Sequence, residues 1–251
     1  MNENGTGFHC HGRAQQIAWA LLVLFACLCG IARAFGQTVQ PVIDENVLGA
    51  PGKKASGIVQ YVNNSGQPLN VVLNLSSFNV AEDGSMQFRP LDPNIHVKLS
   101  TMSFRVAPWQ IYDVFYEASA DQLPSWFVIY GSFSGFRQRS KQGFKIQVQL
   151  PHVVYLLPKQ KLAREEVKLQ QAVLKDRNIT VSVENSGSMF GRALETDILS
   201  SSGKIVQNGF ALFPSSVRTL QIPWEQQDAP SKVIVRFEHF TLEQPIGKRA
   251  E

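Results

Sequence analysis

One local pattern occurs twice in this chain, once in each half. A run of alternating apolar residues leads into Asn-Ser-Gly at residues 59–66 and again at residues 181–187. Two further landmarks follow in the same order in both copies, a glycine and then Phe-x-apolar-x-Pro: Gly84 and Phe104–Pro108 in the first, Gly203 and Phe210–Pro214 in the second. Turn residues are common, so chance agreement is the alternative explanation. We interpret the recurrence as one supersecondary unit used twice.

Strand-like segments dominate both halves. They are short, rich in β-branched and aromatic residues, and bounded by Gly, Pro, Asn and Asp, which is typical of antiparallel β-sandwiches. The segments are 57–62, 69–75, 104–106, 111–116, 126–133, 144–150, 153–157, 179–183, 193–199, 204–206, 217–222 and 232–237. The predicted fold class is therefore all-β, with two immunoglobulin-like β-sandwich domains after a signal peptide.

Length and composition fit two domains of about 100 residues each. The chain has 251 residues, of which 44% are apolar and 18% charged, enough to build packed cores. We place the first domain at 38–157 and the second at 160–245, with a hinge at 158–161. Residues 164–175 consist of good helix formers but also alternate at period 2. We favour a strand, because the repeat requires an edge strand before Ile179, and a helix is the alternative.

The first 34 residues have the features of a secretory signal peptide. Arg13 precedes an apolar run from Ile17 to Ile31, and Ala32–Ala34 has the small-x-small pattern of a cleavage site. We therefore expect cleavage near Ala34 and a periplasmic or secreted mature chain that does not span the membrane. A retained membrane anchor is less favoured, because a spanning helix needs about 20 apolar residues. Lipid attachment at Cys27 is a further alternative.

Groups capable of catalysis or metal binding are sparse. All three cysteines lie in the predicted signal peptide, so the mature chain has no disulfide and no thiolate site. The histidines His96, His152 and His239 lie far apart and lack metal-ligand spacing, so we expect them at the surface or half-buried. Adjacent acids, at 44–45, 82–83 and 165–166, are interpreted as turn or solvated-face charge. No nucleophile elbow or phosphate loop occurs, and we expect no catalytic residue, no metal and no other cofactor.

The charge balance argues against a nucleic-acid partner. Without residues 1–34 the chain keeps 22 basic and 19 acidic residues, a net charge of +3. The basic residues are scattered and form no arginine-rich stripe, which a nucleic-acid-binding surface would need.

The segment Phe144–Leu150 alternates without a break. One face carries Phe144, Ile146, Val148 and Leu150, and the other carries Lys145, Gln147 and Gln149. The pattern has two interpretations. It fits a core strand of a closed sandwich, and it also fits a border strand whose backbone groups and apolar side chains are offered to a partner strand.

Several of these motifs together resemble the periplasmic pilus-assembly chaperones. The chain has Val62–Gly66, Phe104–Pro108, Leu123-Pro124 followed by Trp126-Phe127, and an alternating strand that runs from Phe144 to Pro158. The resemblance covers residues 40–158 well and the second domain loosely. It implies two immunoglobulin-like domains that cap pilus subunits, with Phe144, Ile146, Val148 and Leu150 lent to a subunit lacking its own last strand. It also implies an outer-membrane usher as a further partner.

The chain departs from this family where the subunit's terminal carboxylate would be anchored. The family uses an Arg from the first strand and a Lys from the last strand of domain one, but residues 39–47 contain neither. Val153 aligns with the Lys, with His152 beside it, and Lys53 and Lys54 come later, in a turn. The charged run after Leu-Pro is replaced by Ser125-Trp126. We predict a non-enzymatic, chaperone-like subunit binder that acts by strand addition; the alternative is a structural or adhesive extracytoplasmic module.

Overall fold

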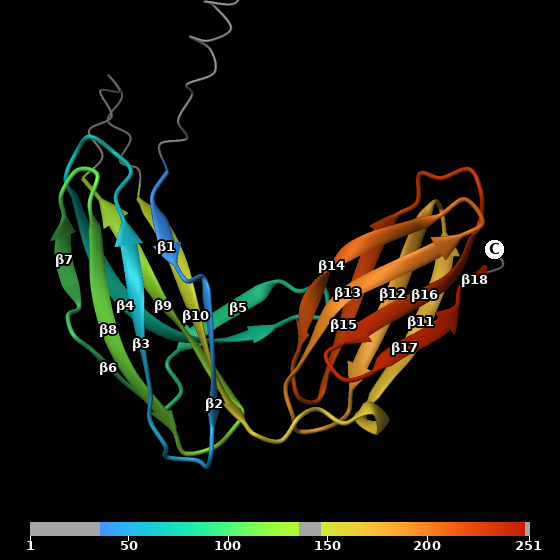
Figure 1. The fold of residues 1–251 in the computed structure, drawn as a ribbon, viewed down its shortest axis with the longest axis horizontal. Coiled ribbons are helices and arrows are strands. Elements are labelled where there is room, and N and C mark those ends of the chain that lie inside the picture. The colour runs from blue at the N-terminus through green and yellow to red at the C-terminus, as the bar shows by residue number, and fades with distance from the viewer. Residues whose placement is uncertain (1–35, 136–146, 249–251) are drawn as a thin grey trace, which may run out of the picture. The chain divides into compact units, whose positions relative to one another are not determined.

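Two β-sandwiches follow one another along the chain (Figure 1). The computed structural model describes residues 36–135 and 147–248, so the predicted signal peptide, Phe144 and Ile146 lie outside the described residues. Within these two ranges the regular elements are strands and one short 3₁₀ turn. The all-β prediction is confirmed. No helix in the described part of the chain is long and apolar enough to cross a bilayer.

The first sandwich stacks two sheets around a shared apolar core. One sheet has the order β1 (Thr38–Gln40), β3 (Ala55–Val62), β8 (Ile111–Ala120) and β6 (Ile95–Leu99). The other has the order β2 (Ile43–Leu48), β10 (Val148–Pro158), β9 (Ser125–Ser134), β4 (Leu69–Val80) and β5 (Met86–Pro90), with β7 (Ser103–Val106) also on β4. Only β2 and β10 pair in parallel here; the other described pairs are antiparallel. Every second side chain points inward, and Val59, Val114, Phe127 and Val154 are fully buried between the sheets.

The second sandwich repeats this arrangement. A 3₁₀ turn, η1 (Arg164–Glu166), precedes a sheet with the order β15 (Ser216–Pro223), β12 (Asn178–Asn185), β11 (Val167–Lys175) and β18 (Gly247–Lys248). The facing sheet has the order β14 (Lys204–Leu212), β13 (Gly191–Ser200), β16 (Pro230–Phe237) and β17 (Thr241–Pro245). The core between them is closed by Val181, Ile198, Leu212 and Val235.

The ambiguous stretch 164–175 is a strand from Val167 onward, as favoured above. It is not an edge along its whole length, because Val173 and Leu174 pair with the short strand β18. Between the two sandwiches, β10 ends at Pro158 and η1 begins at Arg164. The domain limits 38–157 and 160–245 stay a prediction.

The two recurring Asn-Ser-Gly segments make equivalent hydrogen bonds in both sandwiches. The Asn63 amide donates to the carbonyls of Gln67 (2.8 Å) and Ala107 (3.0 Å), and Asn185 donates to those of Met189 (2.8 Å) and Phe213 (3.0 Å). Both asparagines are fully buried. In each copy the amide therefore joins its own turn to the residue before the proline of the Phe-x-apolar-x-Pro segment, which explains why these landmarks recur together.

The two sandwiches also contact each other, since the described chain from Gln37 onward forms one compact unit. Phe213, which follows β14, packs its ring against aromatic side chains on the outer face of the first sandwich: Phe78 at 6.1 Å, Trp126 at 4.7 Å and Tyr155 at 6.3 Å between centroids. The tip of the β4–β5 hairpin (teal in Figure 1) adds a polar contact, because the Glu82 carbonyl accepts hydrogen bonds from the backbone N–H of Thr219 (2.7 Å) and from the Arg218 side chain (2.8 Å).

Candidate partner-binding edge

The last strand of the first sandwich has one incompletely covered side. β10 pairs with β9 from Val148, opposite Phe133, through to Leu156. On its other side β2 begins to pair only at Val153, opposite Ile43. We call the uncovered side of β10 between Val148 and His152 the open edge, since no strand among the described residues pairs with it there.

The open edge exists because the first strand changes sheets. Residues 38–40 pair with β3 in the facing sheet, and only after Pro41 and Val42 does the chain join β10 as β2. The junction is fixed by two hydrogen bonds. The Val153 N–H donates to the Val42 carbonyl (2.8 Å), and Nδ1 of His152 lies 2.6 Å from the Pro41 carbonyl.

Two of the four predicted partner-binding residues can be placed. Val148 and Leu150 point inward, half-buried, and pack against the core of their own sandwich. His152, Val154 and Leu156 continue the same face. The apolar face of the strand packs inward, as in a core strand, and the backbone on its open edge has no partner among the described residues. That the strand binds a partner stays a prediction.

His152 is fully buried, so the expectation of a surface or half-buried histidine is wrong at this position. The burial of His152 could have been predicted from the sequence, because its position in the alternation of β10 places it on the same inward face as Val148 and Leu150. Its Nε2 has no hydrogen-bond partner among the described residues. Burial lowers the pKa of His152 below its usual value, although the Pro41 carbonyl and the charge of Asp44 act in the opposite direction. The ring is therefore held neutral, with the Nδ1–H donated to the Pro41 carbonyl.

A second polar group holds β2 in place. The Tyr116 hydroxyl, from the facing sheet, donates to the Asp44 carboxylate and accepts a hydrogen bond from the Asn46 amide (3.3 Å). Burial, and then the hydrogen bond to Asp44, raise the pKa of Tyr116 above its usual value. Asp44 and Glu45 lie within β2 and not in a turn; Asp44 is half-buried, whereas Glu45 is exposed, as expected for a solvated-face charge.

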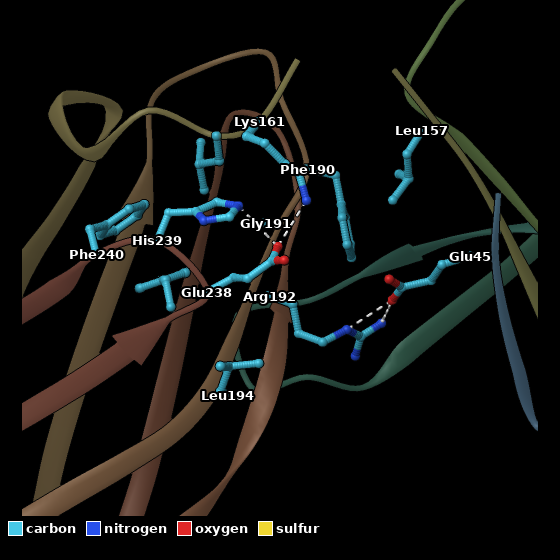
Figure 2. A pocket seen from close by; sticks show the side chains of 12 residues that line it. Glu45, Leu157, Lys161, Phe190, Gly191, Arg192, Leu194, Glu238, His239 and Phe240 are labelled. Carbon is cyan, nitrogen blue, oxygen red and sulfur yellow. Dashed lines mark hydrogen bonds and ion pairs between the residues drawn. The ribbon is translucent and has the colours of Figure 1, made fainter. Parts of the chain in front are cut away.

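Glu45 lines a cavity of about 400 Å³ beside the end of β10 (Figure 2). Figure 2 shows Arg192, from β13, reaching Glu45, with Nε 2.9 Å from the carboxylate. The guanidinium also lies 5.7 Å from the centroid of the Tyr155 ring, within the range of cation–π contacts. Glu45 of β2 and Arg192 of β13 thus form an ion pair between the two sandwiches. Neither Arg192 nor Phe213 was singled out from the sequence.

A second charged group lines the same cavity. Glu238 lies between Lys161, whose Nζ is 2.8 Å away, and His239, whose Nε2 is 3.2 Å away. Each of the three basic side chains at the cavity is therefore matched by a carboxylate of the chain itself. Throughout residues 36–135 and 147–248, no group of His, Cys, Asp and Glu is arranged to hold a metal ion.

Comparison with known proteins identifies the fold. No family model matches the sequence, and no curated protein matches it significantly. Among solved structures, the class 5 fimbriae chaperone CfaA is 9% identical, with a TM-score of 0.50 over 84% of this chain and 99% of that chain. The YadV chaperone is 10% identical, with a TM-score of 0.50 over 83% and 98% of the two chains. The Salmonella enterica SafB chaperone structure, solved in complex with SafA pilin, gives 12% identity and a TM-score of 0.51 over 85% and 98%. The chain thus has the two-sandwich fold of solved pilus chaperones.

Proposed function

We propose that this chain is a periplasmic chaperone-like protein that binds pilin-like or other surface subunits by strand addition along β10. The observation that carries the proposal is the register of β2, which starts at Val153 and leaves Val148–His152 without a described partner on that side. An added strand would satisfy the unpaired backbone groups there. The fold likeness supports the same function, since the SafB structure is a complex with a pilin.

The proposed binding residues are Val148 and Leu150, together with Phe144 and Ile146 upstream. On this view the chain is a binding protein and not an enzyme. Removal of residues 1–34 on export would deliver it to the periplasm, and an outer-membrane usher would receive the loaded complex. Domain limits of 38–157 and 160–245 belong to the same proposal.

The test is capture of a pilin-like subunit encoded beside this chain's gene, after co-expression in an envelope-bearing host. Val148→Asp should abolish co-purification, because the half-buried apolar face of β10 would meet the added strand as well as its own sandwich core, and a charge is unfavourable in both places. Val148→Thr keeps the shape and serves as a variant that folds, and Ile146→Asp tests the upstream part of the strand. Gln87→Asp adds the same charge at an exposed position of β5, on the opposite edge of the same sheet, and should leave capture unchanged.

Far-UV circular dichroism shows whether each variant stays β-rich. If Val148→Asp and Ile146→Asp both fold and still capture the subunit at wild-type levels, strand addition is not the mechanism. The same result would favour the structural or adhesive module, for which the inward packing of Val148 and Leu150 is the supporting observation.

A further inference from the structure

The polar groups on the open edge can be assigned one by one. In an extended strand, the N–H and C=O groups of successive residues point to opposite sides. The Val153 N–H donates to Val42, which belongs to the segment leading into β2. The odd-numbered residues of β10 therefore face the open edge, so that Gln149 and Pro151 are the residues whose backbone is offered there.

Pro151 has no N–H group and cannot donate. Between Val148 and the start of β2 the open edge thus offers one donor, the Gln149 N–H, and two acceptors, the carbonyls of Gln149 and Pro151. The next donor along the strand, at Val153, is already bonded to Val42 at 2.8 Å. A proline within a sheet is confined to edges for this reason, because a strand laid across it leaves one carbonyl unpaired.

Resting on the proposed function, we propose that Pro151 sets the inner limit of the bound strand. An extended segment of a pilin-like subunit pairs with Gln149 and with the Pro151 carbonyl, and then ends its pairing. Beyond that point the place is occupied by Val42 and β2. The bound segment would therefore be one that ends or turns opposite Pro151, leaving its next carbonyl in water.

The test adds the missing donor with Pro151→Ala. In the unliganded variant the new backbone amide at position 151 should exchange rapidly with deuterium, as should that of Gln149, whereas the amides of Val148 and Leu150, which face β9, should exchange slowly. With the purified subunit from the capture experiment as probe, the Gln149 amide and the new amide should both become protected. Affinity should rise about 2- to 10-fold, the effect of one additional backbone hydrogen bond.

Pro90→Ala is the matched control. Pro90 ends β5, on the opposite edge of the same sheet, so the variant loses the same ring without changing β10, and its affinity should equal that of the wild type. The proposal that Pro151 limits the bound strand would be overturned by slow exchange of the new amide in unliganded Pro151→Ala. An unchanged affinity of this variant for the subunit would overturn it as well. If Gln149 is protected by the subunit but Pro151→Ala brings no gain, only the limit fails. If the subunit never protects Gln149 in the wild type, the proposed function and the limit fail together.

Discussion

The buried asparagines allow one stability prediction to be worked out in detail. In Asn63→Ala the side-chain amide is lost from a fully buried position. The Val106 carbonyl, 3.2 Å away and itself buried, then loses one of its donors at a place that water does not reach, which costs about 1–3 kcal/mol. The carbonyls of Gln67 and Ala107 are only partly buried, so water replaces those bonds, at a further cost of about 0.5–1.5 kcal/mol. We expect the free energy of unfolding to fall by about 2–4 kcal/mol.

Urea unfolding followed by tryptophan fluorescence measures this, because Trp126 lies in the first sandwich and Trp224 in the second. Asn185→Ala should show a loss of similar size, since its amide serves a buried carbonyl of Phe213 at 3.0 Å. Asn70→Ala, at an exposed position on β4, is the control and should change stability by less than about 0.5 kcal/mol. A loss below about 1 kcal/mol in either buried variant, or an equal loss in the control, would refute the shared role of the two turns.

Three further perturbations test contacts around the first sandwich. Lowering the pH from 7 to 5 should destabilise the chain through His152, because burial lowers its folded-state pKa below the unfolded value of about 6.5. The unfolded chain then binds a proton that the folded chain does not, so stability is lost as pH falls. Urea titrations at the two pH values should show a smaller loss in His152→Gln than in the wild type. Phe213→Ala should lower the free energy of unfolding by about 3–5 kcal/mol in the same assay, since the ring is only 7% exposed. A double-mutant cycle of Glu45→Gln and Arg192→Gln should give a coupling energy of about 0.2–1 kcal/mol, because both side chains are partly exposed.

Each of these expectations has a contrary result. Full wild-type pH dependence in His152→Gln would show that another group titrates. For Phe213→Ala, a loss no larger than in Phe115→Ala, an exposed ring on β8, would show that the aromatic contact contributes little. A coupling energy above about 2 kcal/mol would mean that the ion pair of Glu45 and Arg192 is far better shielded from water than its exposure indicates.

The sequence was sufficient for the fold class because the relevant signals are local. Alternation, turn residues and the recurring Asn-Ser-Gly segments each act over a few positions, and together they predict the strands and the doubled architecture. The inward position of His152 could also be predicted from the sequence, since the alternation of Val148 and Leu150 continues through it. The absence of metal-ligand spacing does not indicate whether a histidine is buried. The burial of His152 follows from its position in the strand.

The open edge and the charged cavity depend on pairings that no local pattern contains. Whether β10 is covered at Val148 is decided by where the first strand changes sheets, far earlier in the chain, and β2 meets β10 only from Ile43 onward. The partner of Glu45 is 147 positions away, at Arg192. Similar charges occur along the whole chain, so only the folded arrangement selects which of them meet.

The tip of the β4–β5 hairpin has a consequence for how this protein behaves in a crowded solution. β15 is an edge strand of its sheet, and the unpaired backbone groups of an exposed edge strand can pair with other chains and cause aggregation. The Glu82 carbonyl accepts a hydrogen bond from the backbone N–H of Thr219 on that edge, and the Arg218 guanidinium donates to the same oxygen. The hairpin of the first sandwich thus covers part of the exposed edge strand of the second. Shortening the hairpin should therefore lower the solubility of the protein before it lowers its stability.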